Sequence, residues 1–296
     1  MAEEQATRRT EQVDRLGAEW ETHRPAVFGV AYRLLGSVAD AEDVAQDVWL
    51  RAAAADLAEV DDLRAWLVTV AARRSYDILK SARVRQETYV GPWLPEPLLT
   101  GPDASESVLV DESVSTAMLL VMENLSPPER VAFVLHDVFG FEFARIAEVL
   151  EVSGAAARQL ASRARRRVAK ANETTPQGSK AERRRLLAAF RTAYEEGDLA
   201  GLVRLLDPDA VYVTDGGGKV SAARKLIHGG RRIAEVMVRV GRQLRPDRIE
   251  LVEVGGEPAL VFHRHGRVYS VDTVQISDGL ITAYRRVINP DKLRHL

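Results

Sequence analysis

The stretch SGAAARQLASRARRRVAK, from Ser153 to Lys170, holds six basic residues and no acid. On a helix at about 100° per residue, its apolar side chains fall in one narrow stripe and its basic ones cover the remaining surface. The stripe consists of Ala157, Leu160, Ala161, Ala164 and Val168. Ser153 suits the N-cap position, where a hydroxyl accepts an early backbone N–H. Because a solvated surface helix normally interleaves acids with its bases, this one-sided charge favours nucleic-acid binding.

Composition places the chain among ordinary globular proteins. Its 296 residues are 46% hydrophobic and 28% charged, which is enough for two or three domains. The absence of cysteine excludes a disulfide framework and a thiolate metal site, and it suits a reducing cytoplasm. The polar N-terminus MAEEQATRRTEQ is not a secretory signal, and no apolar run approaches the roughly 20 residues that span a bilayer. We therefore expect a cytoplasmic protein without a membrane partner.

The net charge of −2 hides an uneven distribution. Residues 1–172 contain 20 basic and 27 acidic side chains, whereas the remaining 124 residues contain 21 and 16. The acids concentrate between Asp40 and Asp62, where eight acids accompany a single base, Arg51. A DNA-binding chain with so acidic an N-terminal part is expected to have a second, basic partner.

Helical patterns account for most of residues 25–172. Residues 25–36, 38–55 and 63–85 show helical periodicity, with Pro25 expected at the first helical position. The stretch TYVGPWLPEPLLTGPDASES then has the prolines of a linker, yet it is unusually apolar. Further on, Ser126 opens a helix through a capping box, and a short helix at 141–150, a turn and the basic stretch form a helix-turn-helix. Glu151 holds the turn position that usually needs glycine, so a left-handed turn there is expected to be strained.

The C-terminal part has the pattern of an α+β domain. Residues 172–180 form a short polar linker, after which helices are expected at 183–196 and 222–244. Strands are expected at 209–214, 248–254, 258–265, 268–277 and 280–288, with glycine turns between the last four. Helices followed by a meander of long strands predict a curved sheet wrapped on helices.

The acidic helix DAEDVAQDVWLRA, the proline-containing linker and the helix-turn-helix ending in ASRARRRV together resemble an extracytoplasmic-function (ECF) sigma factor, the promoter-specificity subunit of bacterial RNA polymerase. The remainder resembles a SnoaL-like domain of the NTF2-like superfamily, and WLPEP, DGGGK and NPDKL look like marks of the SigJ-like group. The implied fold is multidomain, with two all-α sigma domains (a region 2 bundle and a region 4 helix-turn-helix) and an α+β cone. The implied bounds are 1–86 for region 2, 87–112 for the linker, 113–172 for region 4, 173–180 for a second linker and 181–296 for the SnoaL-like domain.

The resemblance implies that region 4 contacts the −35 element and region 2 the melted −10 strand of promoter DNA. In the terminal helix the expected base-reading residues are Arg158, Gln159, Ser162 and Arg163, and the expected backbone contacts are Arg165, Arg166 and Arg167. In the earlier helix the expected strand contacts are Arg73, Arg74 and Lys80. Arg74 stands where many relatives carry asparagine.

The resemblance also supplies a basic partner for the acidic helix. The expected docking residues on a basic coiled coil of the β′ subunit of core RNA polymerase are Asp43, Gln46 and Asp47. The β subunit of the core is expected as a further partner. The charge distribution of the chain would then follow from its binding both a basic protein surface and DNA.

SigJ-like relatives are thought to modulate the sigma factor with their own C-terminal domain in place of a separate anti-sigma protein. We therefore predict that the apolar linker packs on that domain near a glycine-rich loop and the C-terminal tail, and so biases the spacing of regions 2 and 4. The expected contact residues are Trp93, Leu94 and Pro95 of the linker, Asp215, Gly216, Gly217, Gly218 and Lys219 of the loop, and Asn289, Pro290 and Asp291 of the tail.

Two features suggest a phosphate or metal site and fail on spacing. DGGGK is not a phosphate loop, because that motif needs glycine at 213 and Ser or Thr at 220, where this chain has Val213 and Val220. His263 and His265 share a strand face, but the local sequence offers no third ligand. We therefore expect neither a cofactor nor a metal.

Other functional classes stay open as alternatives. Asp215, His228, Asp272 and Tyr284 could line a cyclase-like pocket, yet no spacing among them defines a catalytic pair, so no enzyme is predicted. A SnoaL-like cyclase or isomerase fused to a DNA-binding part is one alternative. A ligand-responsive helix-turn-helix regulator that acts without polymerase is another, and the acidic helix argues against it. A small-molecule ligand of the SnoaL-like domain stays open as a partner.

Overall fold

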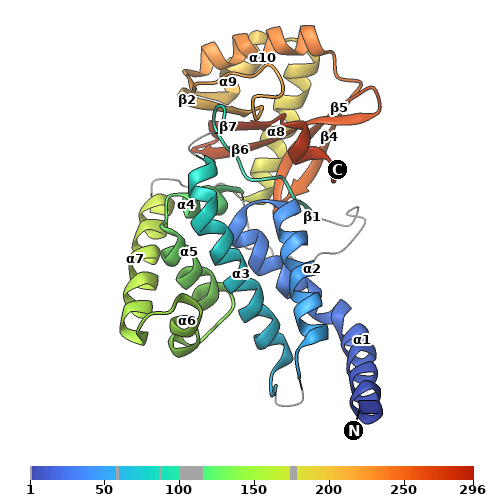
Figure 1. Ribbon diagram of the computed structural model, residues 1–296. Helices are drawn as coiled ribbons and strands as arrows, with labels where there is room; N and C mark the ends of the chain where they lie inside the picture. Colours follow the sequence, from blue (N-terminus) through green and yellow to red (C-terminus); the bar gives the residue numbers. More distant parts are fainter. Residues whose placement is uncertain (1, 58–59, 87–88, 101–115, 174–178) are drawn as a thin grey trace. The chain divides into compact units, whose positions relative to one another are not determined.

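The computed structural model describes residues 2–57, 60–86, 89–100, 116–173 and 179–296, and these form two compact units (Figure 1). The first unit comprises the described parts of 1–84 together with 123–167. The second comprises the described parts of 85–122 together with 168–296. The linker therefore belongs to the same compact unit as the C-terminal domain.

The N-terminal part of the first unit contains the helices α1 (Ala2–Leu35), α2 (Val38–Ala54) and α3 (Leu63–Gln86). Ser37 caps α2, and its hydroxyl accepts the Asp40 N–H at 3.1 Å. The expectation that Pro25 begins a helix is wrong, because Pro25 lies inside α1. Inside a helix, proline removes one backbone hydrogen bond and its ring crowds the carbonyl one turn earlier. The residues before it form helix readily, and α1 continues across it despite that cost.

A helix-turn-helix completes the first unit. The helix-turn-helix consists of α6 (Phe143–Leu150) and α7 (Gly154–Glu173). Three elements precede it in the chain: α4 (Thr116–Glu123), α5 (Pro127–Phe133) and the π-helical segment η1 (Val134–Val138). Ser153 Oγ accepts the Ala156 N–H at 3.2 Å, as its N-cap position predicts. Every residue of the predicted apolar stripe of α7 is buried, so the predicted helix-turn-helix is confirmed.

Side chains of the helix-turn-helix part bind the N-terminal helices within this unit. Arg130 Nη1 donates to the Leu34 carbonyl at 2.8 Å, and Arg145 Nε donates to Thr69 Oγ1 at 3.2 Å. Arg130 is itself buried, and Glu123 pairs with it at 2.7 Å. A buried guanidinium needs such partners, so these contacts help to hold the unit together.

In the described residues, the second unit is built on a seven-stranded sheet of order β1-β4-β5-β6-β7-β2-β3. The strands are β1 (Leu99–Thr100), β2 (Leu206–Asp215), β3 (Ile227–His228), β4 (Arg248–Val254), β5 (Glu257–Arg264), β6 (Arg267–Ser277) and β7 (Leu280–Val287). β2 and β7 run parallel, and the other neighbouring pairs in these residues are antiparallel. The edge strand β1 belongs to the linker, so the linker is part of the C-terminal sheet.

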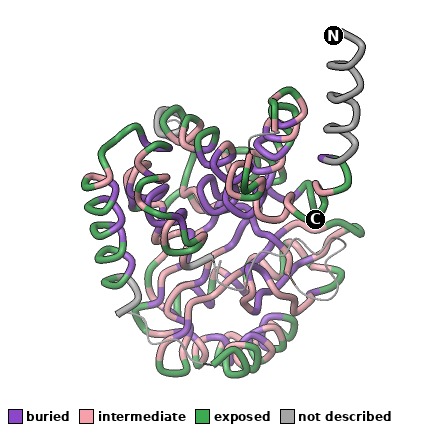
Figure 2. Tube along the Cα trace, turned by 90° about the horizontal axis from the view of Figure 1, so that it is seen from below, coloured by how far each residue is buried: buried purple, intermediate pink, exposed green. Residues whose placement is uncertain are grey.

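The two faces of the sheet bury different partners. One face packs against α8 (Lys180–Glu196), α9 (Leu199–Leu205) and α10 (Gly230–Leu244), around aromatic side chains such as Phe190 and Phe262 (Figure 1). On the other face, Leu94 of the linker and Leu293 of the tail pack with valines of the strands. Figure 2 shows buried residues along the chain where these elements meet and exposed residues on the outer turns. The predicted sheet wrapped on helices is confirmed.

The predicted helix at 222–244 is wrong in its first third. Residues 222–229 form a loop and the short strand β3, and α10 begins at Gly230. Gly229 has a φ of 96°, which no helical residue adopts, so the helix cannot extend back through it.

The α6–α7 turn generates a stability prediction. Glu151 is the C-cap of α6 and lies in the left-handed region at φ 57° and ψ 44°, as expected from its place in the turn. Glycine adopts this conformation without strain, so Glu151→Gly should raise the free energy of unfolding by about 0.5–1 kcal/mol. Urea unfolding of the full chain followed by circular dichroism measures the change. Glu151→Ala keeps the β-carbon and should give no such gain; an equal gain would show that the turn is not the cause.

Candidate nucleic-acid interface and linker-docking cluster

The outer face of α7 carries all the side chains that the sequence predicts to contact DNA in this part of the chain. All seven are exposed: Arg158, Gln159, Ser162, Arg163, Arg165, Arg166 and Arg167. In the described residues, Arg158 and Gln159 have no hydrogen-bond or ion-pair partner, while Arg166 Nε donates only to the Ser162 carbonyl at 3.4 Å. The first turns of the helix thus present unpaired donors.

The other three arginines are paired with carboxylates of the preceding helices. Arg163 Nε and Arg167 Nη1 lie 3.2 and 2.6 Å from the two oxygens of Glu129, and Arg165 Nε lies 2.6 Å from Asp137 Oδ1. The sequence pattern predicts only DNA contacts for these arginines. Here they also anchor α7 to α5 and η1.

Glu129 is the centre of that anchor. It is buried at the third position of α5, and its carboxylate accepts hydrogen bonds from the Ser126 N–H at 3.0 Å and hydroxyl at 2.7 Å, which completes the predicted capping box. Burial alone would raise the pKa of Glu129, but the hydrogen bonds from Ser126 and the charges of Arg167 and Arg163 outweigh it and lower the pKa. The carboxylate therefore stays ionised and holds both arginines.

The predicted polymerase-binding residues share one face of α2. Asp43 and Gln46 are exposed, Asp47 is half-buried, and their spacing of three and four residues places them side by side. Leu50 extends this face by one turn and is 58% exposed, the highest value among the exposed large hydrophobic side chains of the described residues. Sequence reasoning missed Leu50, although its place seven residues after Asp43 on the same face is the signal that could have found it.

The predicted strand-binding residues of α3 are each engaged by a neighbour. Arg74 Nε lies 2.8 Å from Asp47 Oδ2, so a predicted DNA contact pairs with a predicted polymerase contact. Arg73 Nη2 donates weakly to the Glu148 carbonyl at 3.4 Å. Lys80 lies 2.8 Å from Asp77, and the hydrogen bond to that carboxylate raises the pKa of Lys80. Each cation is still exposed and can exchange its partner for a phosphate.

In the second unit, the linker, the glycine-rich loop and the tail converge on Asp215, whose side chain is fully buried at the end of β2. Oδ1 accepts the Tyr89 hydroxyl at 2.5 Å and the Gly217 N–H at 3.1 Å. Oδ2 accepts the Leu94 N–H and the Lys292 ammonium, both at 2.8 Å. Burying a carboxylate is costly unless it is paired with a cation and hydrogen-bonded. Each of these donors is therefore held in place by its bond to Asp215.

Lys292, in the 3-10 helix η2 (Pro290–Leu293), is the buried cation of this cluster. Its Nζ also donates to the Leu94 carbonyl at 2.5 Å and stands 4.2 Å from the centroid of the Trp93 ring and 5.2 Å from that of Tyr89. An ammonium over aromatic faces is attracted by their π electrons, which strengthens the hold of the tail on the linker.

Further contacts join the same three segments. Asn289 Nδ2 donates to the Tyr89 hydroxyl at 3.0 Å, and Lys219 pairs with Asp291. A β-carbon on Gly217 would overlap the Asn289 amide, which explains the glycine. Of the residues that the sequence names for this contact, the structure joins Trp93, Leu94, Asp215, Gly217, Lys219, Asn289 and Asp291. Pro95 is buried in the linker, and Pro290 is exposed. Their regulatory role stays a prediction.

Sequence reasoning missed the two side chains that complete this cluster, Tyr89 and Lys292. Tyr89 lies just before WLPEP, and Lys292 lies within NPDKL, so both were next to quoted motifs. Burial and the hydrogen bond to Asp215 raise the pKa of Tyr89, which keeps its hydroxyl a donor. These two residues are hereafter grouped with Trp93, Leu94, Asp215 and Asn289 as the docking cluster.

The four side chains considered for a cyclase-like pocket do not all meet. Asp272 and Tyr284 are buried on the helix-covered face, where Tyr284 donates to Asp272 at 2.5 Å and Arg286 pairs with the same carboxylate. Asp215 lies on the opposite face, and His228 is exposed. His263 binds Glu250 at 2.8 Å. The described residues contain no group of three or more side chains that could hold a metal ion, and none of their helices is long and apolar enough to cross a membrane.

Comparison with known proteins gives matches over nearly the whole chain. The family sigma-70 region 2 matches residues 20–85, and the family sigma-70 region 4 matches residues 115–168. The ECF RNA polymerase sigma factor SigJ of Mycobacterium tuberculosis is 38% identical over 93% of this chain and 92% of its own length. The probable ECF RNA polymerase sigma factor SigI of the same species is 31% identical over 95% of this chain and 96% of its own length. The crystal structure of M. tuberculosis SigJ matches with a TM-score of 0.75 and 36% identity, covering 94% of this chain and 98% of that one.

The docking cluster generates a second prediction. Lys292→Met keeps the length of the side chain but leaves the buried Asp215 carboxylate without its cation, which should weaken linker docking by about 3–5 kcal/mol. The Leu94 N–H donates to Asp215 while the linker is docked, so its exchange with solvent deuterium should be faster in the variant. Lys219→Met removes only an exposed pair and should cost less than about 1 kcal/mol. Wild-type exchange of the Leu94 amide in Lys292→Met would contradict the role given to this ion pair.

Proposed function

This chain belongs to the extracytoplasmic-function sigma factors, and we propose that its own C-terminal domain controls it by holding the linker between regions 2 and 4. As a sigma factor it directs RNA polymerase to promoters, and it is a transcription regulator rather than an enzyme. Its partners are the polymerase core and promoter DNA. We infer that it acts in the cytoplasm, where both partners lie.

Region 4 is proposed to recognise the −35 element with the first turns of α7. Arg158, Gln159 and Ser162 are exposed there, and a recognition helix reads base edges with residues of its N-terminal half. Arg163, Arg165 and Arg167 can reach phosphates only by leaving or sharing their carboxylates. Their contribution to DNA affinity is therefore smaller than their charge alone suggests, and Arg166 is the better backbone contact.

Region 2 is proposed to dock on a basic coiled coil of the β′ subunit through the acidic face of α2. Asp43, Gln46 and Asp47 supply the polar contacts, and Leu50 supplies an apolar contact beside them. A basic partner that pairs with Asp47 competes with Arg74 for the same carboxylate. Polymerase binding would thus release Arg74 toward the −10 strand.

The buried ion pair of Asp215 and Lys292 is the observation that carries the regulatory proposal. It fixes Leu94 through both backbone groups, because Leu94 N–H donates to Asp215 and its carbonyl accepts from Lys292. β1 holds the linker again a few residues later. A linker held at both places cannot adjust freely to the spacing of the −10 and −35 elements, so docking is expected to lower or redirect promoter activity.

Binding of promoter DNA by the protein with core polymerase can separate two classes of arginine. Arg158→Ala should cost about 1–3 kcal/mol on the preferred −35 element and relax the preference there, because Arg158 contacts base edges. Arg166→Ala should weaken binding to all sequences alike and lower the slope of log affinity against log salt by roughly one, because it neutralises one phosphate. Binding to wild-type and scrambled −35 duplexes over a salt series measures both. Equal and sequence-independent effects would contradict the division.

A double-mutant cycle on transcription tests regulation by the linker. Trp93→Ala and Asp215→Ala each remove part of one cluster, so their effects on promoter activity should be non-additive, with a coupling energy of about 0.5–3 kcal/mol. Trp93→Ala combined with Arg239→Ala, an exposed residue of α10, is the matched control and should be additive. Additive effects in both cycles would refute the proposal that docking of the linker controls the sigma factor.

A further inference from the structure

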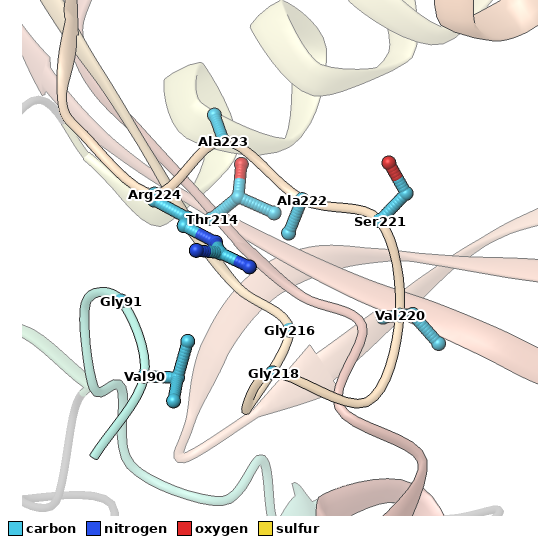
Figure 3. Close-up of a pocket in the computed structure, with 10 residues that line it drawn as sticks. All are labelled: Val90, Gly91, Thr214, Gly216, Gly218, Val220, Ser221, Ala222, Ala223 and Arg224. Carbon is cyan, nitrogen blue, oxygen red and sulfur yellow. The ribbon is translucent and has the colours of Figure 1, made fainter. Parts of the chain in front are cut away.

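Few large hydrophobic side chains of the described residues are exposed, and one of them lies at the start of α7. Val90 and Val220 line the small pocket where the linker meets the loop after β2 (Figure 3), and Leu50 lies on the acidic face of α2. Val152 is 38% exposed and lies in the turn between α6 and α7, one residue before the N-cap Ser153. Apolar surface is thus exposed at the end of α7 that a recognition helix inserts into the major groove.

The first turn of α7 extends this apolar surface. Gly154, Ala155 and Ala156 have no polar side-chain group, and Ser153 Oγ is engaged as the helix cap by the Ala156 N–H. A β-carbon on Gly154 would meet no atom of the described residues within 4 Å, so the start of the helix is open on that side. From Arg158 onward, by contrast, most exposed side chains of α7 are polar or basic. The first turn therefore differs in chemistry from the rest of the exposed face.

Ala155 lies on the same face of α7 as side chains that are proposed to contact DNA. It precedes Gln159, Ser162 and Arg166 by four, seven and eleven residues, which places the four in one stripe at about 100° per residue. All four are exposed, and their stripe lies opposite the buried one that packs α7 into its unit. Since the N-terminal residues of a recognition helix contact base edges, Ala155 is among the residues placed to do so.

A methyl side chain at this place favours one kind of base. It neither donates nor accepts a hydrogen bond, so against the polar edges of guanine, cytosine or adenine it would remove water without replacing the lost hydrogen bonds. Thymine presents an apolar group in the major groove, its C5-methyl, and alanine is one of the side chains that contact it. An exposed alanine at the start of the helix therefore favours a T·A pair at the position that the first turn contacts.

We propose that Ala155 is a specificity-determining residue of region 4, which selects thymine at one position of the −35 element by contact with its C5-methyl group. This inference rests on the proposed function of α7 as the helix that recognises the −35 element. It adds an apolar contact to the polar contacts assigned there to Arg158, Gln159 and Ser162. Removing one methyl group from water should contribute about fourfold in affinity.

Selection of −35 sequences from a randomised duplex pool by the full chain with core polymerase, followed by replacement of each thymine with deoxyuridine, tests this contact. Deoxyuridine lacks only the C5-methyl group, so at the contacted position it should weaken binding by about fourfold. This measurement on the wild-type chain needs no variant to fold. In Ala155→Gly the ratio of thymine to deoxyuridine affinity should fall to about one, whatever the absolute affinity. Ala169→Gly removes the same group from an exposed alanine near the end of α7 and should keep the fourfold ratio.

The outcomes distinguish this inference from the proposed function. A selected element without an A·T pair, equal binding of deoxyuridine at every position, or an unchanged ratio in Ala155→Gly overturns the thymine contact, even when Arg158→Ala still relaxes the −35 preference. Loss of the ratio in Ala169→Gly as well overturns its assignment to Ala155. A pool that yields no preferred sequence overturns recognition of the −35 element by α7, and this inference with it. A ratio that is lost in Ala155→Gly and kept in Ala169→Gly supports the contact, even when the linker cycle is additive.

Discussion

Removing the Asp215 carboxylate from water is costly, and the C-terminal unit offsets that cost by bringing donors from two distant segments, the linker and the tail, to it, besides the nearby Gly217 N–H. Lys292 lies 77 residues away in sequence and Leu94 lies 121 residues away. If one segment withdraws, the others are left with an incompletely satisfied buried charge, so they are expected to dock and undock together. The proposed regulation through the linker depends on this property, because a gradual loosening would not give distinct active and inactive states.

Region 4 uses a second buried carboxylate in the same way. Glu129 receives the capping hydrogen bonds of α5 and the charges of two arginines of α7, so the helix that is proposed to enter the DNA groove is oriented by its own basic residues. Those arginines are about half exposed. A DNA phosphate can therefore approach either guanidinium, while Ser126 and the other arginine still satisfy the buried Glu129 carboxylate. The helix is thus held in place before binding by groups that remain available for binding.

Local patterns were enough to predict the helix-turn-helix, the apolar stripe of α7, the left-handed Glu151 and the longer helices and strands of the C-terminal domain, but not the short α9 and β3. Each of these follows from periodicity or turn chemistry within a few residues. Pro25 inside α1 and the loop before Gly230 were missed, since a proline or a pair of glycines shifts a boundary without changing the pattern around it. The edge strand β1 and the partners Tyr89 and Lys292 depend on contacts over more than 70 residues, which no local pattern records. The resemblance to SigJ-like proteins supplied the segments of the docking cluster, and the geometry supplied its chemistry.

The number of residues between the docked linker and each sigma region determines which region docking restrains more closely. Three residue steps separate Gln86, the end of α3, from Tyr89, and they span at most about 10 Å. On the other side, sixteen steps separate Thr100, the end of β1, from the start of α4 at Thr116, and they span up to about 50 Å. Holding Tyr89 therefore restrains the end of region 2 far more closely than holding Thr100 restrains region 4. Release of the docking cluster should act first on the freedom of the −10-binding helix, and only through it on the spacing to the −35 element.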